Sequence, residues 1–214
     1  SGRPLSLADE KELVAKRGFL PETIRDLRIF TVTETDLPAL GVAVPIQALP
    51  STLVLPYLTE RRGNNEVLSR IHKWSGAGIR YPAYLTPAPA AEGYDVVIFE
   101  SELKAGMAFQ LGDQAIGLQG AASFLNRIPE LVNQLRSLIG KVHRVLVVPD
   151  LEFLKTPGGR EPHEALGQMI SLAHGLGIEL GREVLVVFLP DKYLQEGRTD
   201  GGRPRLKADI DGCV

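Results

Sequence analysis

The sequence predicts an α/β protein in which a parallel sheet flanked by helices follows a small helical and antiparallel β appendage. Two observations support this fold class. From Tyr94 onward, apolar runs alternate with helical patterns, which is typical of βαβ units. Residues 43–87 instead hold short β-like runs, separated by the turn compositions RRGNN and SGAG.

These changes of pattern divide the chain into three predicted segments. Residues 1–40 are a helical lead-in, in which Pro21 and Glu22 open a helix as first turns prefer. Residues 41–90 are a small β-rich subdomain, expected as an antiparallel meander of TLVLPYLTE, EVLSRIHKW and AYLTP. Residues 91–214 are the α/β domain, which begins at the end of the connector APAAEG.

Four apolar runs of the last segment are the predicted parallel strands: YDVVIFE, QAIGLQG, VHRVLVVPD and EVLVVFLP. Such continuous runs are typical of strands covered by helices on both faces. The segments FLKTPGGREPHEA and GRTDGGRPRLK are expected to be a long loop and a basic loop. Ligands of parallel sheets bind at the carboxyl ends of the strands, so the residues that close each strand are the first site candidates.

Composition narrows the functional class. The 214 residues are 44% hydrophobic and 23% charged, as in an ordinary globular protein, and the formal net charge of −2 excludes a generally basic nucleic-acid coat protein. A single cysteine, Cys213, excludes a disulfide framework and a cysteine-rich zinc site and favours the reducing cytoplasm. No apolar run reaches the ~18 residues of a membrane span, so no membrane partner is expected.

Carboxylates close several of the predicted strands. Glu100 follows VVIF, Asp150 and Glu152 follow VLVV, and Asp209 and Asp211 lie in the later KADID. Carboxylates from separate strand ends, without His or Cys beside them, are the oxygen ligands that Mg²⁺ prefers. Each acid alone is also compatible with a helix cap or a solvated turn, and Gly117 and Gly120 of IGLQG with ordinary turn glycines.

A basic segment is the candidate nucleic-acid surface. It has two aromatic neighbours, Trp74 and Tyr81, that could stack on bases, and its cations are Arg61, Arg62, Arg70, Lys73 and Arg80. Basic and aromatic side chains together are typical of platforms that bind single strands. The alternative is a solvated basic hairpin.

The ordered motifs resemble those of the Toprim-like domains of plasmid and phage primases. ESELKAGMAFQLGDQAIGLQG resembles the first motif of that family, VLVVPDLE stands where its Asp-x-Asp motif falls, and KADID resembles its closing Lys-x-x-Asp-Asp element. The resemblance covers nearly the whole chain and implies a Rossmann-like parallel sheet.

The resemblance also implies a site and partners. Glu100 would be a general acid or base, Lys104 would reach a phosphate, and Gly117 and Gly120 would form the phosphate-side turn. Mg²⁺, for which Mn²⁺ could substitute, would be held by Asp150, Glu152 and one of Asp209 and Asp211. The implied function is nucleotidyl transfer by a DNA primase module, with single-stranded DNA or primer-template as partner and a helicase or other replication domain as a further one.

Two departures from the motifs keep alternatives open. Ser101 replaces the glycine after the glutamate, and Glu152 replaces the second aspartate of Asp-x-Asp. The longer side chain moves a ligating oxygen, and Mg²⁺ demands near-ideal geometry. The alternatives are a catalytically inactive Toprim-shaped module that binds nucleic acid or a partner, and a Toprim nuclease.

Overall fold

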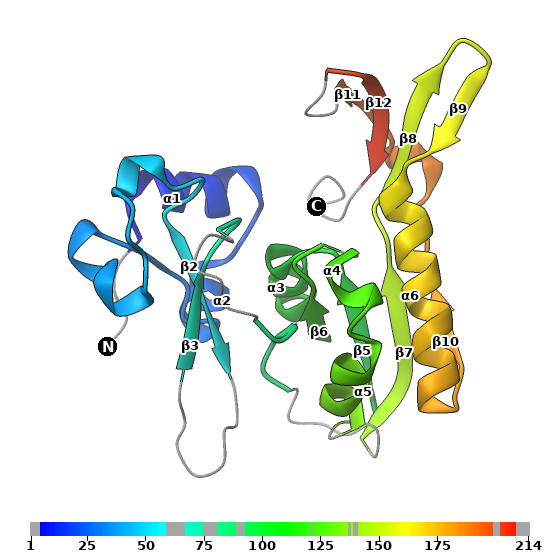
Figure 1. The fold of residues 1–214 in the computed structure, drawn as a ribbon, viewed down its shortest axis with the longest axis horizontal. Helices are drawn as coiled ribbons and strands as arrows, with labels where there is room; N and C mark the ends of the chain where they lie inside the picture. Colours follow the sequence, from blue (N-terminus) through cyan, green and yellow to red (C-terminus); the bar gives the residue numbers. More distant parts are fainter. Residues whose placement is uncertain are drawn as a thin grey trace. The chain divides into compact units, whose positions relative to one another are not determined.

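The structure is a computed structural model that describes residues 5–58, 67–74, 81–88, 93–120, 122–136, 138, 141–198 and 202–208. The chain divides into two compact units, Ser1–Leu85 and Thr86–Val214 (Figure 1).

Unit 1 combines short helices with a small antiparallel sheet. The helices are α1 (Leu7–Glu10), the π-helix η1 (Lys11–Lys16), α2 (Pro21–Asp26) and the 3₁₀ turns η2 (Glu34–Asp36), η3 (Pro38–Leu40) and η4 (Ile46–Ala48). The strands are β1 (Phe30–Thr31), β2 (Leu53–Leu58) and β3 (Val67–Ile71), in the order β1-β2-β3. The helical lead-in and the antiparallel pairing of β2 with β3 confirm the predicted appendage.

One part of the predicted meander was wrong. The third sheet position beside β2 belongs to β1, where Phe30 pairs with Val54, and not to the run AYLTP. That run forms β4 (Tyr84–Leu85), an end strand of the five-stranded sheet. Thr86, directly after it, explains this: its hydroxyl accepts from the Ala115 N–H at 2.8 Å and donates to the Ala115 carbonyl at 3.2 Å.

A buried carboxylate ties the first helix of unit 1 to its sheet. Asp9 of α1 is 8% exposed, and its Oδ2 accepts three hydroxyl hydrogen bonds, from Ser6 at 3.0 Å, Thr31 at 2.6 Å and Thr52 at 2.8 Å. Buried charge is tolerated when it is fully hydrogen-bonded. The network therefore fixes α1 against β1 and the start of β2.

Unit 2 is built on a five-stranded sheet of order β10-β7-β5-β6-β4, in which the end strand β4 holds the last two residues before the boundary between the units. Its strands besides β4 are β5 (Tyr94–Phe99), β6 (Gln114–Gly117), β7 (Val142–Val148) and β10 (Val184–Val186), and these four run parallel. The helices are α3 (Glu102–Gln110), α4 (Ala122–Leu125), α5 (Ile128–Arg136) and α6 (Glu164–Leu180). The α/β class and the four parallel strands of the prediction are confirmed.

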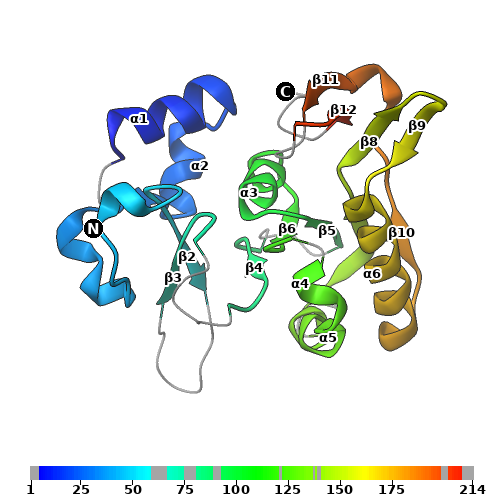
Figure 2. The same cartoon turned by 45° about the horizontal axis from the view of Figure 1, so that its top comes forward.

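The order of the strands determines which face each helix covers. The chain crosses from β5 to β6 in one direction and from β6 to β7 and on to β10 in the other. Right-handed crossovers then place α3 on one face and α5 and α6 on the opposite face. The packing agrees, because α3 contacts β5 and β6 whereas α5 contacts α6, which packs on β7 and β10 (Figure 2).

A second sheet extends unit 2 and corrects two predicted loops. FLKTPGGREP forms the hairpin of β8 (Leu151–Thr156) and β9 (Gly159–Pro162). The basic segment near the C-terminus forms β11 (Gln195–Arg198) and β12 (Pro204–Ala208), preceded by the 3₁₀ turn η5 (Asp191–Tyr193). The four strands pair antiparallel in the order β11-β12-β8-β9. Leu151, Leu166 and Ala208 form a small buried cluster on one face of this sheet.

Replacement of Asp9 by alanine should lower the free energy of unfolding by about 2 kcal/mol, because three hydroxyl groups lose their common acceptor. Urea denaturation followed by circular dichroism measures this. Glu10→Ala, an exposed neighbour on the same helix, is the control and should change stability by less than about 0.5 kcal/mol. Equal effects of the two substitutions would contradict a structural role of the Asp9 network.

Candidate functional site

The candidate site lies where the two sheets of unit 2 meet. Only Pro149 and Asp150 separate β7 from β8, so Asp150 stands at the carboxyl end of a parallel strand and at the start of an antiparallel one. Glu100 directly follows the neighbouring strand β5, and its Oε1 accepts the Asp150 backbone N–H at 3.3 Å. The structure thus brings together two of the predicted strand-end acids.

Two lysines converge on the Asp150 carboxylate. Lys104, in the first turn of α3, contacts Oδ1 through its ammonium group. Lys207 of β12 contacts Oδ2 at 2.8 Å. The Asp150 and Lys104 side chains are 9% and 8% exposed, whereas that of Lys207 is 26% exposed. Both carboxylate oxygens are therefore engaged by ammonium groups, one of them buried and the other reached by solvent.

The register of the antiparallel sheet explains how Lys207 arrives there. Lys207 lies opposite Glu152, and Arg205 lies opposite Leu154. Each cation reaches diagonally toward the β7–β8 junction, so that Arg205 Nη1 donates to Glu152 Oε1 at 2.9 Å while Lys207 bonds Asp150. Side chains at alternate positions of β12 share one face, which places both cations on the side of Asp150.

Burial and charge act in opposite directions on the two acids. Burial raises the pKa of Glu100, the nearby Asp150 carboxylate raises it further, and Lys104 opposes them only in part. Burial also raises the pKa of Asp150, but Lys104 and Lys207 outweigh it, so that this pKa is lowered overall. Asp150 is thereby held ionised, and Glu100 holds its proton to higher pH than a free glutamate does.

The described carboxylates do not fit a magnesium site. Both Asp150 oxygens bond ammonium groups, and Glu152 is paired with Arg205. In the part of the chain that the structure describes, no group of three or more His, Cys, Asp or Glu side chains could hold a metal ion. Asp209 and Asp211, the remaining predicted ligands, lie outside the described residues.

The two glycines of IGLQG are required by the backbone. A Cβ on Gly117 would stand 2.5 Å from Glu102 Cα and 2.8 Å from Glu102 N, so only glycine lets β6 approach the start of α3 this closely. Gly120 has φ +90°, and its N–H donates to the Glu100 carbonyl at 3.0 Å. Both glycines therefore position the segment that carries Glu100 and Lys104.

The candidate nucleic-acid residues belong to unit 1. Arg70 of β3 is 8% exposed, with its guanidinium 5.7 Å from the centre of the Tyr81 ring. Lys73 is exposed at a left-handed position, φ 63°, and Trp74 packs against the hydrophobic cluster around Val54. Arg61, Arg62 and Arg80 lie outside the described residues.

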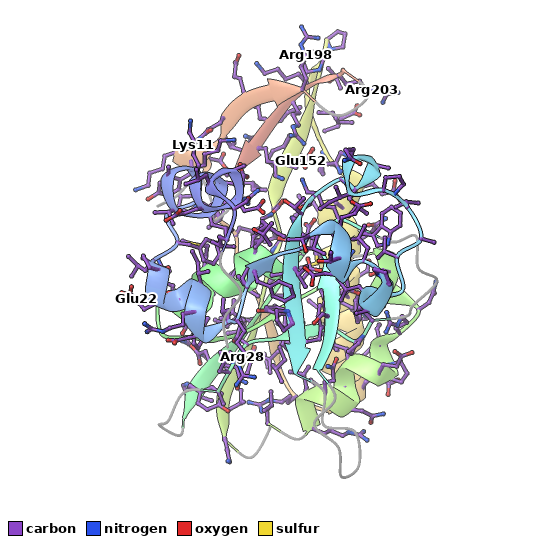
Figure 3. All side chains as sticks on the ribbon, turned by 90° about the vertical axis from the view of Figure 1, so that its left-hand side faces the viewer. Lys11, Glu22, Arg28, Glu152, Arg198 and Arg203 are labelled. Atoms are coloured by element: carbon purple, nitrogen blue, oxygen red, sulfur yellow. The ribbon has the colours of Figure 1, made fainter. Side chains whose placement is uncertain are left out.

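Two site residues, Arg205 and Lys207, were expected only as part of a basic loop and were not named as site candidates. The signal was present in RPRLKA, where cations alternate with Leu206 and Ala208 as they do in a strand with one covered face. The neighbouring glycines and polar residues favoured a loop instead. Figure 3 labels Glu152 toward the base of this antiparallel sheet and Arg198 and Arg203 toward its far end.

Comparisons of the chain with protein-family models, curated proteins and solved structures found no match. The resemblance to Toprim-like primase domains therefore stays a prediction. In the described part of the chain, no helix is at once long and apolar enough to cross a bilayer.

Gly117→Ala should destabilise the protein by about 2–3 kcal/mol, because backbone atoms of Glu102 occupy the space that the new methyl group needs. The measurement is the urea midpoint of unfolding. Gly167→Ala is the matched control: it meets nothing within 4 Å on a helix, and should stabilise by about 0.5–1 kcal/mol. A Gly117→Ala protein as stable as the wild type would contradict the close approach of β6 to α3.

Proposed function

We propose that unit 2 is a binding module for the sugar-phosphate backbone of nucleic acid, in a Toprim-shaped replication protein, and that Lys207 with Arg205 and Lys104 supplies its cations. The observation that carries the proposal is the pair of ammonium groups on Asp150. Lysine side chains of the protein itself provide the positive charge that a phosphate needs at this edge of the sheet. No metal ion has to be recruited for that purpose. Ligand binding at such an edge is the general rule for parallel α/β sheets.

The three cations differ in exposure, and we assign them different roles for that reason. Lys104 is buried with Asp150, so it keeps the carboxylate neutralised. Lys207 and Arg205 are 26% and 29% exposed in their side chains and can turn a proton donor toward a phosphate oxygen. An arginine offers a fork of donors and a lysine a compact point charge, a combination suited to a phosphodiester.

The charge of the site supports an anionic ligand that is favoured by protonation. Lys104, Arg205 and Lys207 balance Asp150, Glu152 and Glu100 when all six groups are ionised. The raised pKa of Glu100 makes it the carboxyl group that first takes up a proton as pH falls. Protonation then gives these six groups a net positive charge.

Nucleotidyl transfer or cleavage is the second candidate function, because of Glu100. A buried carboxyl group with a raised pKa, next to an ionised aspartate and a lysine, is typical of a general acid or base. In this candidate, Glu100 would exchange a proton with the 3′-hydroxyl or with the leaving oxygen. Only this second candidate would need Mg²⁺, or Mn²⁺ in its place. The described carboxylates do not form a site that would hold such an ion.

Lys207→Gln should weaken binding of a short fluorescein-labelled single-stranded oligonucleotide about 3- to 10-fold in fluorescence anisotropy. The slope of log K against log salt should fall by about 0.7, as expected for one lost phosphate contact. Lys155→Gln is the matched control, since Lys155 lies on the opposite face of β8 and pairs with Glu196.

Equal losses for Lys207→Gln and Lys155→Gln would contradict the proposed site and indicate general electrostatic attraction. Binding that appears only after Mg²⁺ or Mn²⁺ is added, together with loss of nucleotidyl transfer in Glu100→Gln, would favour the second candidate.

Oligonucleotide affinity should rise as pH falls from 8 to 5.5, because protonation of Glu100 removes a negative charge beside Lys207. In Glu100→Gln this part of the pH dependence should disappear, and affinity at pH 8 should match that of the wild type at low pH. The free energy of unfolding should also be higher at low pH. Because the pKa of Glu100 is raised in the folded protein, the protein loses stability as pH rises through that pKa, and the Glu100→Gln variant should not show this loss. Anisotropy titrations and urea unfolding at several pH values measure the two effects, and an unchanged pH dependence in Glu100→Gln would contradict this role.

A further inference from the structure

Positive side chains follow one face of β12 at every second position. Lys207 and Arg205 lie on that face, and Arg203, directly before the strand, occupies the next alternate position. We call these three cations the β12 row. Alternate residues of a strand are about 6.8 Å apart, so the row is about 14 Å long. Arg203 is exposed and lies toward the end of the sheet away from Glu152, so the row leads outward from the Asp150 site (Figure 3).

The acids that pair with this row are more deeply buried than its cations. Glu152 and Asp150 are each 7% exposed. Their partners Arg205 and Lys207 are 29% and 26% exposed in their side chains. The bond to Glu152 Oε1 uses one of the five N–H donors of the Arg205 guanidinium. A ligand that approaches this face therefore meets the cations before the carboxylates.

The neighbours of Arg205 across the sheet are neutral. Gly197 of β11 lies opposite it on one side and Leu154 of β8 on the other. A Cβ on Gly197 would stand 3.7 Å from Arg205 Nε, so glycine keeps the space beside the guanidinium clear of a β11 side chain. Leu154 is half-buried and offers an apolar contact to a sugar ring. The middle of the row thus suits a ligand chain that lies along β12.

The opposite face of the same sheet presents its charges differently. There Lys155 pairs with Glu196, and Arg160 pairs with Asp191. The Glu196 and Asp191 side chains are 78% and 63% exposed, so cation and acid reach solvent side by side and their charges cancel for an approaching ligand. Positive charge is therefore presented on the face of Arg205.

Given the function proposed above, on which this inference rests, we propose that the β12 row binds a single strand of nucleic acid along β12, with one phosphate at each cation. Successive phosphates of an extended strand are separated by nearly the same distance as alternate residues of a β-strand. Three neighbouring phosphates can therefore meet the three cations in register. A single strand can adjust its backbone to the twist of β12, whereas a duplex is stiff and winds its phosphates around the helix axis.

The salt dependence of binding counts the phosphate contacts. For three contacts, the slope of log K against log salt for a labelled oligothymidylate should be about −2. Arg203→Gln should reduce the size of the slope by about 0.7 and weaken binding about 3- to 10-fold. When Arg203→Gln is combined with Lys207→Gln, the losses of slope should add to about 1.4, because the two cations are about 14 Å apart. Arg160→Gln is the matched control: it removes the same charge from the opposite face and should change neither quantity.

The length of the oligonucleotide tests the register. Unlabelled oligothymidylates without terminal phosphates, in competition with the labelled strand, should gain affinity steeply up to the tetranucleotide, which has three phosphates, and little beyond it. In Arg203→Gln the steep part should end one nucleotide earlier. A blunt-ended DNA hairpin should bind more weakly than a single strand with the same number of nucleotides. Circular dichroism and the urea midpoint should be unchanged in each variant, which separates loss of binding from loss of folding.

This proposal and the proposed function fail in different ways. If Lys207→Gln binds as Lys155→Gln does, the nucleic-acid site itself is wrong. If Lys207→Gln weakens binding but Arg203→Gln binds as Arg160→Gln does, the site stands and the β12 row is overturned. Tighter binding of the hairpin than of the single strand would overturn the choice of a single strand as the ligand.

Discussion

The ion pairs of Asp150 are the interaction on which the arrangement of unit 2 depends. One carboxylate joins three elements that are distant in the sequence: α3 through Lys104, the β7–β8 junction through its own backbone, and β12 through Lys207. Because the pair with Lys104 is buried, loss of Asp150 would leave the Lys104 ammonium group uncompensated in a low-dielectric environment, which is far more costly than the pair itself is favourable. The antiparallel sheet is thereby locked to the edge of the parallel one.

The same interaction gives the site a fixed charge. A lysine carries one positive charge that belongs to the chain, whereas a divalent ion must be recruited and needs several oxygen ligands in near-ideal geometry. Lys104 satisfies Asp150 from inside the protein, so that Lys207 can exchange a carboxylate oxygen for a phosphate oxygen without leaving Asp150 unpaired. Structure and proposed binding are compatible because the two ammonium groups differ in exposure.

The parallel sheet could be predicted from the sequence, because short continuous apolar runs such as VVIF and VLVV, spaced by helical patterns, are typical of buried parallel strands. The β8–β9 hairpin and the β11–β12 strands were not predicted, because their exposed positions carry polar residues, and glycines such as Gly158, Gly159 and Gly202 suit loops as well as turns between strands. Strand-end acids were correctly expected near one another for Glu100 and Asp150. Their partners could not be predicted, since a carboxylate at a strand end suits an ammonium group as well as a metal ion, and only the register of β12 places Lys207 beside Asp150.

The balance of charges also determines what can regulate the site. Among the described side chains named above, three cations stand against three carboxylates, so one proton changes the sign of their summed charge, and the raised pKa of Glu100 assigns that proton to Glu100. Asp150 does not take up this proton, because Lys104 and Lys207 lower its pKa. Glu100 is also bonded to the Asp150 backbone, so its protonation acts at the junction of the two sheets. The site therefore responds to proton concentration at Glu100, the carboxyl group whose pKa burial and the neighbouring Asp150 raise.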